Sequence, residues 1–190
     1  MDRTPQESFD RDKFKQVVHY ICANCTLEEL GNVKLHKALY FADMLTYMAT
    51  LRPLTGVEYQ KQKFGPVAKH LSWAINELCK DGALKVQKRD YFGFSKVDYI
   101  ALQQPSRGRL TNSEIALLDD VIDFVCARSA KEISELSHDA AWCKAKLGET
   151  IPYYATFGFE PVAVTDADLE AGVEEARRIR QVVDAQRPVC

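Results

Sequence analysis

The sequence predicts an α+β fold that is mainly α-helical, with a helical core, a small β-hairpin or short sheet, and a C-terminal helix. Three observations lead to this prediction. Apolar residues recur at helical spacing in several segments. Two short segments alternate apolar and polar residues around a turn. Ser or Thr stands three residues before Glu at two expected helix starts. With 190 residues, of which 46% are hydrophobic, the chain can bury a full core.

The first predicted element is an amphipathic helix over residues 10–25. Its apolar residues recur at helical spacing: Phe14, Val17, Val18, Ile21, Cys22 and Cys25. The Cys22-x-x-Cys25 pair resembles a metal or redox motif, but a structural zinc site needs four ligands and the chain has no second CxxC. We interpret both residues as packed core thiols. Six cysteines without a regular framework favour a reducing, cytoplasmic location.

The second predicted helix covers residues 33–49, with Asn32 as its N-cap. Apolar residues occupy more than half of its circumference, so we expect a central helix that packs on several neighbours. His36, Asp43 and Tyr47 share the narrow polar side.

Pro53 and Gly56 then end this helix and turn the chain. Residues 57–63 can form a strand. Gly65-Pro66 fits the N-cap and first residue of a third helix, for which Gly82 fits the C-terminal end.

A β-hairpin follows the third helix, with its turn near residues 90–93. The hairpin carries four basic residues: Lys85, Lys88, Arg89 and Lys96. Three helices followed by a basic hairpin give a winged-helix-like outline, and such a wing can contact the DNA backbone. The outer side of the preceding helix, with Trp73, Asn76 and Glu77, is unlike a helix that reads a DNA groove. DNA binding therefore stays a second hypothesis.

Two capping boxes mark the next helices. Thr111 with Glu114 opens a fourth helix, and Ser129 with Glu132 opens a fifth that we expect to run over residues 130–146 with Ile133, Leu136 and Ala140 inward. His138 and Trp142 lie four residues apart on its opposite side. They either pack under the aromatic segment that follows or are displayed as an anchor for a partner. A last helix is expected from Thr165 or Asp166 to Gln186.

Catalytic and membrane functions find little support in the sequence. None of the four histidines stands near a recognisable nucleophile motif, and no glycine-rich phosphate loop is present. We therefore predict no enzyme activity, cofactor or metal. No apolar stretch is long enough for a membrane span, and the first residues do not resemble a secretory signal. Residues 1–110 carry a net charge of +5 and residues 111–190 of −7. This asymmetry reflects either a partner-facing polarity or solvated helix faces.

One continuous segment, residues 34–71, resembles a known family. It contains in order Lys34-Leu35-His36-Lys37, Leu39-Tyr40-Phe41-Ala42-Asp43, Pro53-Leu54-Thr55-Gly56, Glu58-Tyr59 and Phe64-Gly65-Pro66-Val67. Later matches are Leu110-Thr111, Ser129-Ala130, Leu136-Ser137-His138 through Trp142, and Ile151-Pro152-Tyr153. Together they resemble the Panacea domain, which SocA-like antitoxins share with phage-associated GepA-like proteins.

The resemblance implies a Panacea domain over residues 10–155. Residues 156–190 lie outside it, and we expect them to form a C-terminal extension with one helix. It implies a bacterial antitoxin that neutralises a protein toxin by direct binding. Some relatives instead act as adaptors that deliver the toxin to an ATP-dependent protease. A phage-derived interaction protein without a toxin is a further alternative.

Seven residues are our candidates for contact with a partner. They combine polar ends with long apolar stems or large rings: Lys34, Lys37, Tyr40, Tyr59, Lys63, His138 and Trp142. The alternative for the lysines is a buried ion pair that supports the fold.

Overall fold

The computed structural model describes residues 9–26, 28–91, 93–158, 165–167, 170–171, 173–174 and 177–178. The chain divides into two compact units, residues 1–159 and 160–190, and each is considered by itself. The helices of the first unit are α1 (Arg11–Asn24), α2 (Asn32–Thr50), α3 (Leu71–Lys80), α4 (Asn112–Cys126), α5 (Ala130–Leu136), α6 (Ala140–Lys144) and the 3-10 helix η1 (Tyr153–Phe157).

Two small antiparallel sheets complete the first unit. One has the order β2-β1-β5 and consists of β2 (Gly65–Ala68), β1 (Tyr59–Gln62) and β5 (Thr150–Ile151). The other is the hairpin of β3 (Leu84–Tyr91) and β4 (Phe94–Ala101), paired from Leu84 with Ala101 to Tyr91 with Phe94. The prediction of a mainly helical α+β fold with a hairpin after the third helix is confirmed.

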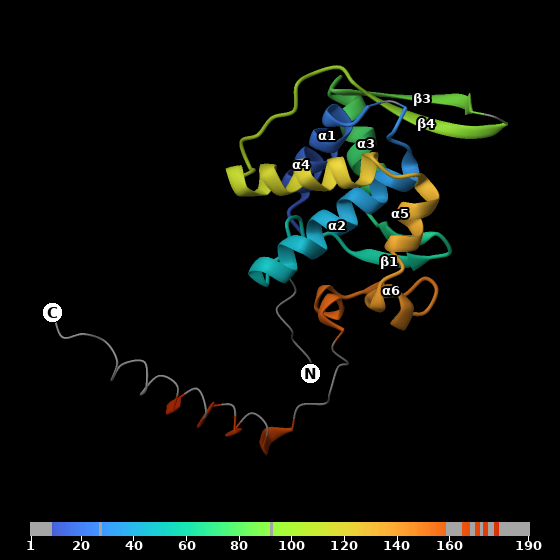
Figure 1. Cartoon of the computed structure of the whole chain (residues 1–190). Coiled ribbons are helices and arrows are strands. Elements are labelled where there is room, and N and C mark those ends of the chain that lie inside the picture. Colours follow the sequence, from blue (N-terminus) through green and yellow to red (C-terminus); the bar gives the residue numbers. More distant parts are fainter. Residues whose placement is uncertain are drawn as a thin grey trace. The chain divides into compact units, whose positions relative to one another are not determined.

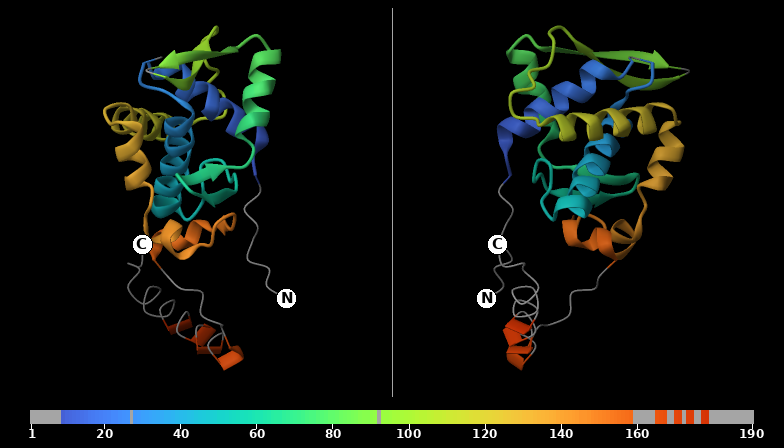
Figure 2. Two further views of the ribbon diagram at one scale, coloured as in Figure 1. Left: turned by 90° about the vertical axis from the view of Figure 1, so that its right-hand side faces the viewer. Right: turned by 60° about the vertical axis from the view of Figure 1, so that its left-hand side comes forward.

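Helix α2 occupies the centre of the first unit. The β3–β4 hairpin lies on one side of it and the β1–β2 hairpin with α6 on the other (Figures 1 and 2). Its buried residues include Leu35, Ala38, Leu39 and Tyr40, which join Phe14 of α1 in the core. The prediction of a central helix is therefore confirmed.

The polar side that the sequence predicts for α2 does not face solvent. Asp43 is only 1% exposed, whereas Leu45 and Met48 on the predicted apolar side are 42% and 49% exposed. The N-cap also differs, because Gly31 holds that position and Asn32 begins the helix. The Asn32 side chain instead accepts a hydrogen bond from the Tyr99 hydroxyl at 3.0 Å.

The prediction that Gly65-Pro66 starts the third helix is wrong. These residues begin β2, which pairs with β1, and α3 starts only at Leu71. The reason lies in the backbone of Gly65, whose φ of +97° turns the chain back along β1. A side chain at this position would collide with Ser137 and Lys37, because a Cβ would lie 2.4 Å from the Ser137 hydroxyl.

The predicted fifth helix over residues 130–146 is two helices. Both capping boxes form as expected, but α5 ends at Leu136 and α6 starts after a new N-cap at Asp139. The Asp139 side chain accepts the Trp142 N–H at 2.9 Å. Ile133 is buried as predicted, whereas Leu136 is half exposed and Ala140 is exposed.

In the second unit the described residues 166–167, 170–171, 173–174 and 177–178 are helical. They agree with a helix in this region, and the rest of the predicted helix to Gln186 lies outside the described residues. Val173 of the expected apolar stripe is half exposed.

Candidate functional site

Helix α2 carries a set of buried polar side chains that bind the segments around it. Asp43 accepts hydrogen bonds from the backbone N–H and hydroxyl of Thr55 and from the Tyr59 hydroxyl, each at 2.7 Å. Burial raises the pKa of the Asp43 carboxyl, and these hydrogen bonds act in the opposite direction. Burial likewise raises the pKa of Tyr59. Asp43 thus fixes the turn after α2 and the start of β1.

Tyr40 links α2 to the start of α6. Its hydroxyl donates to the Asp139 carboxylate at 2.7 Å, and its ring packs edge-on against Tyr59. Burial and the negative charge of Asp139 raise the pKa of Tyr40. The two tyrosines among our candidates are therefore buried, and this structure places neither in reach of a partner.

Lys37 is also buried, at 2% exposure, and its Nζ donates to the carbonyl oxygen of Pro66 at 2.8 Å. Burial lowers the pKa of this ammonium to about 8. Ser137, which is fully buried, donates to the carbonyl oxygen of Ser134. Lys37 therefore ties the β1–β2 hairpin to α2, and among the described residues it has no carboxylate partner of the kind that the ion-pair alternative requires.

Lys34 lies one helical turn before Lys37, near the start of α2, where its Nζ donates to the carbonyl oxygen of Cys126 at 3.2 Å. Burial lowers the pKa of Lys34. The residue borders a cavity of about 700 Å³ that is also lined by Glu29, Lys96 and Ser129. Lys34 thus joins the start of α2 to the end of α4.

The remaining three candidates gather at the tip of the β1–β2 hairpin. Trp142 donates from Nε1 to the carbonyl oxygen of Gln62 at 3.2 Å, and the His138 ring stacks on Trp142 with centroids 3.8 Å apart. The Lys61 ammonium also packs against the Trp142 ring, with Nζ 3.9 Å from the ring centroid. The two aromatic rings therefore form one stack, although they do not share a helix.

His138 carries an unsatisfied atom within this stack. Its Nε2 is buried and has no hydrogen-bond partner among the described residues. Burial, together with the positive charge of Lys37, lowers the pKa of His138. The ring is therefore suited to stacking as a neutral group.

Phe64 was not among the candidates from the sequence, yet it is the most exposed aromatic residue at this tip, with 65% of its surface accessible. Its carbonyl oxygen accepts the Ser134 hydroxyl at 2.8 Å, and the Lys63 ammonium lies 5.5 Å from its ring centroid. The motif Phe64-Gly65-Pro66 contained the signal. Gly65, with its positive φ, directly follows Phe64 at the turn from β1 into β2, whereas the sequence predicted a helix start at this point.

We call the group Lys61, Lys63, Phe64, His138 and Trp142 the tip surface. It combines one exposed phenylalanine, one ring stack and two lysines on adjoining elements. Large aromatic residues dominate the energetics of many protein–protein interfaces.

The β3–β4 hairpin is less basic than its sequence indicates. The buried carboxylate of Asp98 forms ion pairs with Arg89 at 3.0 Å and Lys96 at 3.2 Å. Lys96 also donates to the carbonyl oxygen of Glu28. Two of the four basic residues are thus engaged within the fold, which weakens the case for a DNA-binding wing.

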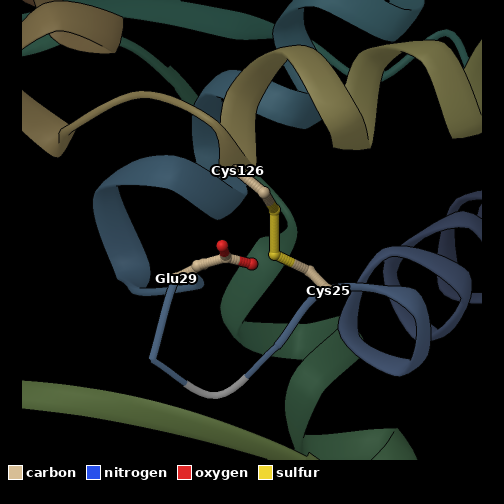
Figure 3. Close-up of side chains that lie close together, drawn as sticks. All are labelled: Cys25, Glu29 and Cys126. Atoms are coloured by element: carbon tan, nitrogen blue, oxygen red, sulfur yellow. A yellow bond between two sulfur atoms is a disulfide. The ribbon is translucent and has the colours of Figure 1, made fainter.

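The interpretation of Cys25 as a core thiol is wrong. Cys25 forms a disulfide with Cys126, which lies 101 residues further along the chain. Only Cys22 of the CxxC pair is a buried free thiol, and burial raises its pKa. Figure 3 shows the Glu29 carboxylate pointing at the two sulfurs, and these three groups lie within 4.8 Å of one another. In the disulfide form the sulfurs offer no thiolate to a metal ion.

No described helix combines the length and apolar character that a bilayer-crossing segment needs.

Comparisons with curated proteins and with solved structures give no significant match. A family model described as "Antitoxin SocA-like, Panacea domain" matches residues 35–143, which is more than half of the chain. This range begins inside α2 and ends inside α6, so it contains all of the tip surface. The chain therefore belongs to the SocA-like antitoxin family defined by the Panacea domain.

Proposed function

We propose that this protein is an antitoxin that neutralises a cognate protein toxin by direct binding, and that the toxin docks on the tip surface. The observation that carries the proposal is Phe64, a large apolar side chain displayed at a turn whose backbone is held from both sides. Exposed apolar side chains of this size on a rigid turn are suited to insertion into a partner's pocket.

The contacts around the turn support a preorganised surface. The Trp142 indole binds the carbonyl of Gln62, and the Ser134 hydroxyl binds the carbonyl of Phe64. Behind them Lys37 binds the carbonyl of Pro66. Three consecutive parts of the turn are thus tied to α6, α5 and α2. A partner would pay little entropy to order this surface on binding.

The buried members of our candidate set support this proposal indirectly. Lys37 and Tyr40 hold the turn and the start of α6 in place, so they position the tip surface without contacting a partner. The proposed roles of Lys63, His138 and Trp142 are direct contacts. Lys34, near the start of α2, binds the carbonyl oxygen of Cys126 at the end of α4 and is not part of this surface.

Co-expression with the product of the neighbouring gene tests the proposal. The neighbouring product alone should stop growth, and the wild-type chain should restore it. The Phe64→Asp variant should bind the toxin at least about 30-fold more weakly, which corresponds to about 2 kcal/mol for an interface anchor, and should fail to restore growth. Binding is measured by titration of the purified pair.

Leu102→Asp is the matched control, because Leu102 is similarly exposed, at 57%, but lies beyond the end of β4. This variant should protect like the wild type. If Phe64→Asp protects equally well, the tip surface is not the docking site. If the neighbouring product is harmless, or the wild type does not restore growth, the antitoxin proposal itself fails.

Two finer alternatives are separated by further measurements. An adaptor that delivers the toxin to an ATP-dependent protease predicts that the toxin accumulates when the protease is removed. A DNA-binding regulator predicts a salt-dependent shift of the promoter fragment of its own operon. Lys85 and Lys88 are exposed on β3 and would carry that contact. Lack of a shift at low salt would exclude it.

A further inference from the structure

The fold brings together two cysteines that nothing in the sequence pairs. Cys25 is the C-cap of α1, and Cys126 is the last residue of α4. Their Cα atoms lie 6.7 Å apart, within the range of disulfide-bonded residues, and their sulfurs are bonded. Since 101 residues separate them, only the folded chain places the two sulfurs in contact.

The pair lies beside the 700 Å³ cavity at the start of α2. Glu29, whose carboxylate points at the sulfurs in Figure 3, lines this cavity together with Lys34. Lys34 in turn binds the carbonyl oxygen of Cys126. Cys126 is partly exposed and Cys25 is 8% exposed, so a small reagent reaches Cys126 first.

The other cysteines in the described part of the chain do not share this geometry. Cys22 is 3% exposed in the core, Cys79 is half-buried on α3, and Cys143 is exposed on α6. All three are free thiols in the structure. The pairing is therefore specific to two of the five cysteines that lie in the described part of the chain.

We propose that Cys25 and Cys126 form a thiol–disulfide exchange site whose reactant is a low-molecular-weight disulfide such as oxidised glutathione. The Cys126 thiolate attacks one sulfur of the reactant and releases one small thiol. The Cys25 thiolate then attacks the Cys126 sulfur of this mixed disulfide and releases the second small thiol. Two electrons pass from the protein to the reactant, and the two protons of the cysteine thiols end on the two released thiols.

Oxidation at this site joins the end of α1 to the junction between α4 and α5. Cross-linking positions so far apart in sequence restricts the unfolded chain strongly. The oxidised protein should therefore melt roughly 5–10 °C above the reduced protein.

The test equilibrates the reduced, folded protein with mixtures of oxidised and reduced glutathione, followed by acid quenching, alkylation and peptide mapping. A cross-linked peptide pair containing Cys25 and Cys126 should appear as the oxidised fraction rises, and the melting temperature should rise with it. In the Cys25→Ser variant, Cys126 should instead retain one glutathione, which identifies it as the point of attack.

Cys143→Ser is the matched control, since it removes an exposed cysteine outside the pair and should leave the redox-dependent melting shift unchanged. The proposal is overturned if Cys25 and Cys126 are recovered as separately alkylated thiols under oxidising mixtures. It is equally overturned if Cys25→Ser melts with the same redox-dependent shift as the wild type.

Discussion

His36 shows how a single family-motif residue acts through its protonation state. Its Nδ1 accepts the backbone N–H of Ala68 at 3.1 Å, which fixes β2 against α2. An acceptor nitrogen carries no proton, so the fold requires the neutral ring. Burial, helped by the positive charge of Lys37, lowers the pKa of His36 to about 4.

This lowered pKa predicts a loss of stability in mild acid. The unfolded chain gains a proton near pH 6.5, whereas folded His36 gains it only near pH 4. The contribution of His36 is thus present above pH 6.5 and is lost as the pH falls toward 4. Between pH 7 and pH 5 it should remove about 2 kcal/mol from the free energy of unfolding. Urea titrations at the two pH values measure it.

The His36→Gln variant tests the assignment, because its amide oxygen can accept the same bond without titrating. Its loss of stability between pH 7 and pH 5 should be about 2 kcal/mol smaller than that of the wild type. His70→Gln, at an exposed position, should behave like the wild type. Equal acid sensitivity of His36→Gln and wild type would contradict the role given to His36.

At the scale of elements, the break between α5 and α6 joins the core to the tip surface. Asp139 caps α6 through the Trp142 N–H and also accepts the hydroxyl of Tyr40, which is fully buried. The Asp139 carboxylate therefore caps the start of α6 and also connects this helix to Tyr40 in the core. The His138–Trp142 stack depends on this arrangement, because His138 directly precedes Asp139 and Trp142 lies in the first turn of α6.

Removing this carboxylate should cost more than removing an ordinary helix cap. Asp139→Ala loses the cap and leaves the Tyr40 hydroxyl buried without an acceptor, so it should lower the free energy of unfolding by about 2–4 kcal/mol. Ser129→Ala, which removes only the cap of α5, should cost about 1 kcal/mol. Denaturant unfolding compares the two, and equal losses would show that the Tyr40 bond contributes nothing.

The elements also show which parts of the structure could be predicted from the sequence. Both capping boxes form as predicted, because each depends on residues three positions apart. The break at Asp139 depends on Tyr40, which lies 99 residues earlier, and the strand at Gly65 depends on packing against Lys37 and Ser137. These long-range contacts leave no local pattern. The N-cap bond from the Trp142 N–H to Asp139 is local, but the apolar pattern over residues 130–146 predicted one continuous helix.

In the candidate site, too, the sequence could not show the long-range contacts of the side chains. The motif residues Lys37, Tyr40 and Tyr59 were predicted as partner-facing because their side chains have polar ends. Their polar ends instead bind buried groups of the fold. Phe64 was missed because Gly65-Pro66 predicted a helix start where the chain turns into β2. The Cys25–Cys126 pair was missed because pairing across 101 residues is a property of the folded chain.

At the scale of the whole molecule, the folding unit is larger than the family match. The match begins at residue 35, yet Phe14 and Val17 of α1 are fully buried in the core. At the other end, the Tyr153 hydroxyl donates to the carbonyl oxygen of Val57 at 2.6 Å, and Ile151 pairs with Tyr59. The first compact unit, residues 1–159, therefore includes elements on both sides of the matched range.

Deleting residues 165–190 should leave this unit folded, because the core, both capping boxes and the disulfide lie before residue 160. The shortened chain should melt within about 2 °C of the full chain, a change of at most about 1 kcal/mol. Deleting residues 150–190 also removes β5 and the buried Ile151, so it should lower the melting temperature by roughly 5 °C or more. Calorimetry of both variants decides the boundary: if the shorter deletion destabilises as strongly as the longer one, residues 165–190 belong to the cooperative core.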